Sequence, residues 1–182
     1  MGSIQEDEWA SLQLRIRSVL RCGSGGSLES YRVERLAQVL VMPSFASWTS
    51  SEIFLVSSGE SDESDAQVDF VATRLTWDQR ADLERLTDSP GQSLVEEPSL
   101  SLLQAPIPHE VARKLASDVA GLHLTLAPGE ASGGLDGTSY VLVLGEYPAE
   151  VLLTWHNRPP DNWVDAGRLS AAVVEMVDAV VK

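Results

Sequence analysis

The chain has 182 residues, of which 43% are hydrophobic, and its mean hydropathy is -0.04. This composition predicts a folded protein with a substantial core and excludes a disordered chain. Asp and Glu number 27 against 13 Lys and Arg, so the net charge is -14. Nucleic acids and anionic membranes would repel such a surface, whereas a basic protein would be attracted to it.

The features that report on cellular compartment favour the cytoplasm. Cys22 is the only cysteine, which excludes an intramolecular disulfide. The N-terminal residues MGSIQEDEW are acidic, and no apolar run approaches the ~20 residues of a membrane-spanning helix. We therefore expect a soluble, cytoplasmic protein.

Residues 9–22 fit two periodic patterns. Trp9, Leu12 and Ile16 share one face of a helix, whereas Leu12, Leu14 and Ile16 also alternate with polar residues as in a strand. We favour the helix and keep the strand as the alternative.

A second helix is expected after the glycine-rich turn at residues 23–26. Ser27 is placed to cap it, Leu36 and Leu40 would be buried, and Pro43 would follow its end. The two helices would then form a hairpin.

Two β-rich segments follow, at residues 52–57 and 67–74, and predict a hairpin. Four acidic residues alternate with serines at its tip, namely Glu60, Asp62, Glu63 and Asp65. Their spacing lacks the glycine and the final glutamate of a calcium-binding loop. The tip is interpreted either as a solvated turn or as an acidic contact surface for a basic protein.

Thr76 and Gln79 form a capping box for a short helix that Pro90 stops, and the residues from 91 to 108 are expected to form a linker with turns. Later elements are predicted in this order: a helix from Pro108 to Gly121, a strand through Leu122, Leu124 and Leu126, strands at 138–144 and 151–155, and a final helix at about 163–181.

These elements predict the α+β class, with antiparallel hairpins packed against several helices. The tripeptide Leu-Thr-Trp occurs at 75–77 and again at 153–155, each time where a strand is expected to give way to a helix. The chain is therefore expected to form one domain, or two similar lobes at about 1–90 and 106–182 that are joined by a linker at 91–105.

The residues that could carry out catalysis or bind a metal are few. His109, His123 and His156 are too far apart in the sequence for a local metal motif, and Cys22 lies beside a glycine-rich turn. No lysine follows the glycines as it would in a phosphate-binding loop. We expect no cofactor and no metal site.

The stretch TWHNRPPDNW at residues 154–163 is interpreted as a packed corner between a strand and a helix. Trp155 and Trp163 would pack the junction, the two prolines would end strand pairing, and Asn162 would cap the helix. The loop between the tryptophans is left to contact a partner through His156, Asn157 and Arg158.

The C-terminal part resembles known small proteins. The segment LDGTSYVLVLG at 135–145, then Trp155, Pro159-Pro160, Trp163 and an apolar terminal helix, is similar to a pattern in small bacterial proteins of largely unknown role and in emfourin-type metalloprotease inhibitors. The resemblance covers about 106–182, and less closely 52–87. It implies a compact, non-catalytic bacterial α+β protein. The chain departs from that family in its length and in its N-terminal helical segment, so no inhibitory residue is carried over.

Two functional hypotheses follow. The first is a non-catalytic inhibitor or immunity protein that blocks a basic toxin or hydrolase by charge-complementary contact, without nucleic acid or membrane as partner. The alternative is a small enzyme or ligand-binding protein whose site is assembled from distant groups, for which Cys22, His109, His123, His156 and scattered carboxylates are the candidates.

Overall fold

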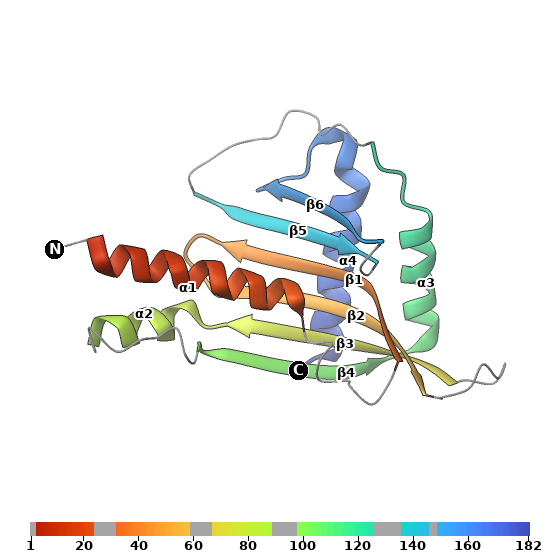
Figure 1. Ribbon diagram of the computed structural model, residues 1–182. Coiled ribbons are helices and arrows are strands. Elements are labelled where there is room, and N and C mark those ends of the chain that lie inside the picture. The colour runs from red at the N-terminus through yellow and green to blue at the C-terminus, as the bar shows by residue number, and fades with distance from the viewer. Residues whose placement is uncertain (1–2, 24–31, 59–66, 89–97, 126–135, 146–148) are drawn as a thin grey trace.

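The structure is a computed structural model that describes residues 3–23, 32–58, 67–88, 98–125, 136–145 and 149–182. These residues form one antiparallel sheet with helices on both faces (Figure 1), which confirms the α+β class. The helices are α1 (Ser3–Cys22), α2 (Gln79–Asp88), α3 (His109–Ala120) and α4 (Val164–Val180). The strands are β1 (Arg32–Pro43), β2 (Trp48–Ser58), β3 (Gln67–Trp77), β4 (Leu100–Ile107), β5 (Thr138–Leu144) and β6 (Val151–His156).

The sheet combines strands from both halves of the chain. Its order is β4-β3-β2-β1-β5-β6, so β4 pairs with β3 at one side and β5 pairs with β1 at the other. The long hairpin of β2 and β3, which the sequence predicted, lies in the middle of this arrangement.

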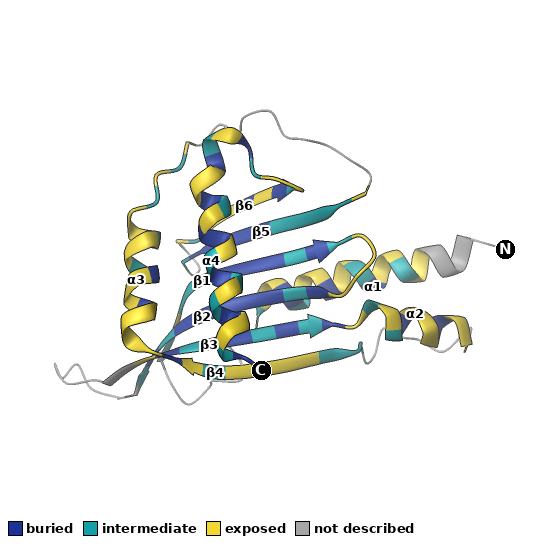
Figure 2. Cartoon of the chain, turned by 180° about the vertical axis from the view of Figure 1, so that it is seen from behind, coloured by how far each residue is buried: buried dark blue, intermediate teal, exposed yellow. Residues whose placement is uncertain are grey.

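Alternating side chains on strands β1 to β5 contribute to two separate cores, one on each face of the sheet. On β1, Val39 and Val41 belong to the core under α3 and α4, whereas Leu40 and Met42 belong to the core under α1. Figures 1 and 2 show α1 on one face of the sheet and α3 and α4 on the other.

Helix α1 confirms the helical interpretation of residues 9–22. It buries Leu12, Ile16 and Leu20 against the sheet. The ring centroids of Trp9 and Trp77 are 5.5 Å apart. This aromatic contact also stabilises the position of the first half of the helix on the sheet.

Helix α4, which the sequence predicted at about 163–181, crosses the opposite face and buries Leu169, Val173 and Val177. Its beginning differs from the prediction, because a 3-10 turn at Asp161–Trp163 precedes it and Trp163 occupies the cap position without a side-chain cap. The prediction that Asn162 caps this helix is therefore wrong. Pro159 and Pro160 instead precede the 3-10 turn directly, and Pro160 occupies the position before its first residue.

The second predicted helix is wrong, since residues 32–43 form β1. This strand lies inside the sheet and is covered on both faces, so apolar residues occur at successive positions and imitate the pattern of a buried helix.

Three smaller predictions also fail. Part of the segment expected as a linker with turns forms β4. Residues 122–125 form no strand, and Leu126 lies outside the described residues. Thr76 belongs to β3, and the cap of α2 is Asp78, whose Oδ1 accepts a hydrogen bond from the Ala81 N–H at 3.0 Å.

None of the helices in the described part of the chain is long and apolar enough to span a membrane.

Candidate functional site: a groove between α4 and the sheet

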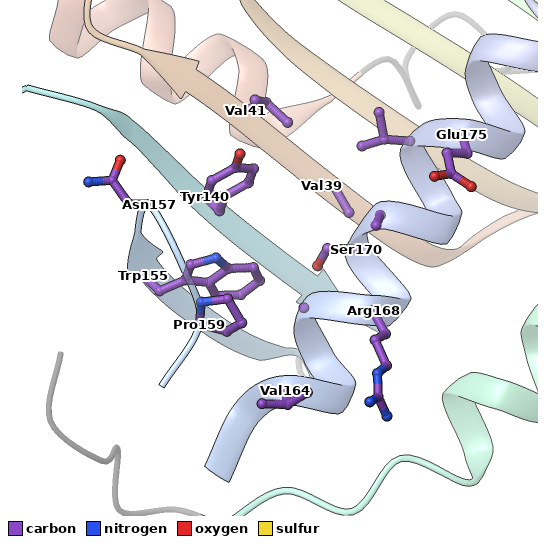
Figure 3. A pocket seen from close by; sticks show the side chains of 13 residues that line it. Val39, Val41, Tyr140, Trp155, Asn157, Pro159, Val164, Arg168, Ser170 and Glu175 are labelled. Atoms are coloured by element: carbon purple, nitrogen blue, oxygen red, sulfur yellow. The ribbon is translucent and has the colours of Figure 1, made fainter. Parts of the chain in front are cut away.

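An apolar groove of about 580 Å³ lies where α4 leaves part of the sheet uncovered (Figure 3). Its floor comes from three neighbouring strands, through Val39 and Val41 of β1, Tyr140 of β5 and Trp155 of β6. The wall formed by α4 contributes mostly small and apolar side chains, namely Val164, Gly167, Ser170, Ala171 and Val174. A concave, mainly apolar surface with few polar groups is typical of a binding site.

The aromatic part of the floor is set by strand pairing. Tyr140 and Trp155 are direct partners on β5 and β6, and their rings stack with centroids 5.7 Å apart. Trp155 is buried, whereas Tyr140 is only half-buried. The stack therefore presents a flat, partly open surface to the groove.

One end of the groove is closed by the segment that joins β6 to α4. Asn157 has a positive φ of 58°, and it exchanges hydrogen bonds with Thr138, its N–H donating at 2.8 Å and its Oδ1 accepting at 3.0 Å. Pro159 packs onto Gly167, where an added Cβ would come within 2.5 Å of the proline ring. The glycine thus allows the connection to lie close against α4.

The rim of the groove carries one charge of each sign, at Arg168 and Glu175. Arg168 forms an exposed ion pair with Asp165, which it contacts at 3.0 Å. Glu175 is exposed, and no ion pair among the described residues includes it. A positive charge on a bound molecule would find its counter-ion at Glu175.

The packed corner predicted for this region is present, whereas contact of its loop with a partner stays a prediction. Trp155 and Trp163 are both buried in one core, and the Trp163 indole donates to the Thr125 carbonyl at 3.0 Å, so the stretch is a packed corner. Of the three residues expected to contact a partner, only Asn157 lines the groove. His156 lies 3.3 Å from the Asp136 carbonyl oxygen, and Arg158 is exposed. The acidic set Glu60, Asp62, Glu63 and Asp65 lies outside the described residues.

The candidate groups for catalysis lie on different elements. Cys22 is exposed at the end of α1, and His109 begins α3 within 3.3 Å of Asp69. His123 lines a separate hollow between α3 and α4 together with Asp118. Within the described residues, no group of three His, Cys, Asp or Glu could hold a metal ion.

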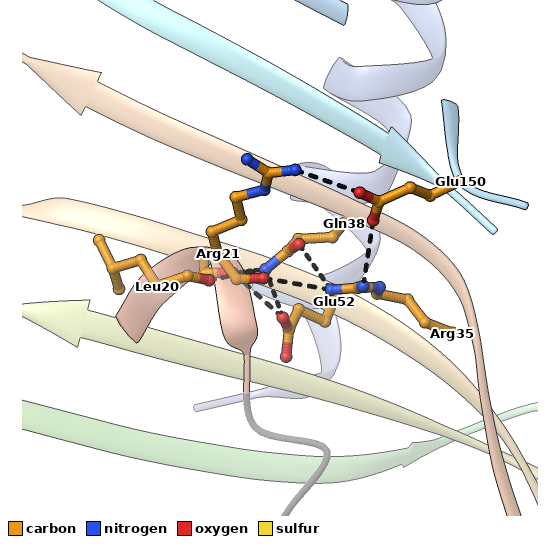
Figure 4. Close-up of polar contacts among 7 residues, drawn as sticks. Leu20, Arg21, Arg35, Gln38, Glu52 and Glu150 are labelled. Atoms are coloured by element: carbon orange, nitrogen blue, oxygen red, sulfur yellow. Dashed lines mark hydrogen bonds and ion pairs between the residues drawn. The ribbon is translucent and has the colours of Figure 1, made fainter. Parts of the chain in front are cut away.

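A buried polar cluster lies on the opposite face of the sheet, under the end of α1 (Figure 4). The Gln38 amide donates to Glu52 at 2.6 Å and to the Leu20 carbonyl at 2.7 Å, and the Thr73 hydroxyl lies 3.1 Å from Glu52. Arg35 donates to the Arg21 carbonyl at 3.3 Å. Because the cluster uses the last carbonyls of α1, it holds that end of the helix on the sheet.

A second buried carboxylate, Asp82, holds α2. It accepts hydrogen bonds from the Trp77 indole at 2.7 Å, from the Ser99 N–H and from Arg85. Burial has the largest single effect and raises the pKa of Asp82, but the hydrogen bonds from Arg85, Trp77 and Ser99 together outweigh it and lower the pKa below 3.8.

No protein-family model, curated protein or solved structure matches the chain. The resemblance to emfourin-type inhibitors stays a prediction.

Sequence reasoning missed most of the groove because its floor depends on β1 being a strand. One signal was available: strands at 138–144 and 151–155 were both predicted, and pairing them across their short connection places Tyr140 beside Trp155. The α4 residues Ala171 and Glu175 gave no such signal, since only the packing of the helix reveals which of its exposed positions border an opening.

Proposed function

We propose that the chain is a non-catalytic binding protein whose groove beside α4 takes an apolar stretch of a basic protein partner. The observation that carries this proposal is an apolar floor with stacked aromatic rings next to the exposed carboxylate of Glu175. Aromatic side chains anchor protein interfaces because they bury a large area at a small cost in conformational entropy.

The charge of the whole chain supports a basic partner. At -14, the protein attracts a cationic surface over a distance of about one screening length, which is ~10 Å at 0.1 M salt. Four of these negative charges lie within six residues of sequence, at Glu60, Asp62, Glu63 and Asp65, and would contribute to this steering. Inhibition of a basic toxin or hydrolase is the activity that such a contact would serve.

The groove can be tested with a defined probe. A synthetic peptide that alternates pairs of leucine and lysine supplies apolar and cationic side chains, and the matching leucine and glutamate peptide is the control for charge. Fluorescence anisotropy of the labelled peptides should show binding of the lysine peptide, and its affinity should fall as salt is raised.

A matched pair of variants distinguishes binding of the peptide in the groove from non-specific electrostatic binding elsewhere on the surface. Ala171 and Ala179 are both exposed on α4, but only Ala171 lines the groove. Ala171→Trp should fill the groove and weaken binding by about tenfold or more, whereas Ala179→Trp should leave it within about twofold. Equal binding by the two variants, or equal binding of the two peptides, would exclude the groove as the site.

A further inference from the structure

The helical layer on the groove's face of the sheet is incomplete above Tyr140. Helix α4 lies mainly over β1 to β4, and α3 packs against β1, β3 and α4 on the same face. Tyr140 on β5 stays half-buried, and the groove opens above it and Trp155, beside α4 (Figure 3). Because the elements that cover a sheet face form one packed layer, the groove is a gap in a layer of helices.

The dimensions of the gap match those of a short helix. The α4 residues that line it run from Val164 to Glu175, which at ~1.5 Å per residue is ~16 Å or about three helical turns. The floor runs from β1 across β5 to β6, and two strand spacings of ~4.8 Å make it ~10 Å wide. An α-helix with its side chains is about 10–12 Å in diameter. The gap therefore has the width of one helix.

The α4 wall allows a second helix to come close. Pro159 already fills the space above Gly167, where an added Cβ would meet its ring. Ala171 follows one turn later on the same side of α4, is exposed, and has a side chain of one carbon. Since the distance between packed helices is set by the side chains at their contact, the closest approach is expected at Ala171.

The backbone of the floor is already paired in β1 and β5, each of which has a neighbouring strand on both sides. Two polar side chains of the lining are also engaged. The Ser170 hydroxyl donates to the Ala166 carbonyl at 2.9 Å, and Asn157 Oδ1 accepts from the Thr138 N–H at 3.0 Å. An extended segment would bring an N–H and a C=O per residue to this surface, and burying them unpaired is costly. A helix pairs these groups within itself, so only its side chains have to fit.

We propose that the partner's segment in the groove is an amphipathic α-helix that lies beside α4, with its apolar residues toward Tyr140 and Val41 and a lysine or arginine next to Glu175. This inference rests on the proposed function and narrows the apolar stretch to a helix of about three turns. Over that length, apolar residues at spacings of three and four face the floor.

Charge decides what kind of helix fits. The carboxylate of Glu175 at the rim favours a cationic side chain on the bound helix. Two copies of the chain, each with a net charge of -14, repel each other, so a second copy is not the occupant. The helix therefore belongs to a basic protein.

Two labelled peptides of the same composition test the conformation of the occupant. The peptide with paired leucines and lysines places its leucines at spacings of three and four, whereas a peptide in which the two residues alternate strictly has the pattern of a strand. Fluorescence anisotropy should show at least tenfold tighter binding of the first. If neither binds, the proposed function fails together with this inference. If the alternating peptide binds as tightly as the first or more tightly, the proposed function stands and the helix is wrong.

A proline substitution in the first peptide tests the helix without changing its leucines. Proline at a central lysine interrupts a helix, whereas alanine at the same position removes the same charge and preserves it. The proline peptide should bind at least tenfold more weakly than the alanine peptide, and difference circular dichroism should show that the alanine peptide gains helix when it binds. Equal affinities of the two peptides would overturn the inference.

A pair of variants tests where the helix lies. Glu175→Gln should weaken binding of the first peptide several-fold. Glu110→Gln removes the same charge from an exposed position of α3 that does not line the groove, and should change the affinity by less than about twofold. Equal effects of the two variants would contradict a basic helix beside Glu175.

Discussion

Tyr140 and Trp155 occupy opposed positions on β5 and β6, and the planes of their stacked rings differ by only 12°. Stacked aromatic pairs usually close a core, but here α4 passes to one side and leaves Tyr140 only half-buried. The same two residues therefore stabilise the strand pair and form the floor of the groove.

The corner next to the groove is expected to contribute strongly to stability. Trp163→Ala should lower the free energy of unfolding by roughly 3 to 5 kcal/mol, because it removes a buried aromatic ring and leaves the Thr125 carbonyl without its indole donor. Arg158→Ala, at an exposed position of the same stretch, should change it by less than about 0.5 kcal/mol. Urea denaturation measures both values, and the reverse ranking would show that the stretch is not a packed corner.

The end of α1 depends on Gly23. Its φ is 73°, and an added Cβ would lie 2.0 Å from Oε1 of the buried Glu52. Gly23→Ala should lower the free energy of unfolding by at least about 2 kcal/mol. The left-handed conformation alone costs roughly 1 kcal/mol for alanine, and the close contact between the added Cβ and Glu52 increases this cost. Gly121 ends α3 with an ordinary φ of -85°, so Gly121→Ala is the matched control and should cost less than about 1 kcal/mol. If thermal or urea unfolding shows that the two variants lose similar amounts of stability, the side chain of Glu52 can move away from the added Cβ.

Asp82 should make stability depend on pH in the acid range. Its pKa is lower in the folded than in the unfolded protein, so its contribution is present above pH 3.8 and is lost as pH falls through the lowered pKa. Asp82→Asn should reduce the free energy of unfolding by about 1 to 3 kcal/mol at neutral pH, because buried donors lose a charged acceptor. The difference in free energy of unfolding between Asp82→Asn and the wild type should become smaller below about pH 4.

The control for Asp82 is Glu84→Gln, which breaks the exposed pair between Glu84 and Arg80 on the same helix. Exposed pairs contribute little, so this variant should stay within about 0.5 kcal/mol of the wild type. A difference between Asp82→Asn and the wild type that does not change with pH would contradict the lowered pKa.

The sequence was most informative where an element has one covered face. Helix α4 and strand β6 show clear periodicity because one side is packed and the other is open. Strand β1 was misread because two cores cover it, and β4 was misread because a border strand with few buried residues resembles a turn-rich loop. The corner at Trp155 and Trp163 could be predicted from tryptophans that flank prolines. The groove could not, because it depends on how far α4 lies from the sheet.

Site-specific photo-cross-linking in cells of the source organism addresses the binding site itself. A benzophenone amino acid replaces Ala171, which lines the groove, or Ala179, which lies outside it on the same helix. We expect position 171 to capture one protein through a segment rich in Lys, Arg and apolar residues, at a yield that exceeds that of position 179 by about tenfold and falls with added salt. Capture of an acidic segment, equal capture at both positions, or no protein captured at position 171 would contradict a groove that receives a basic partner.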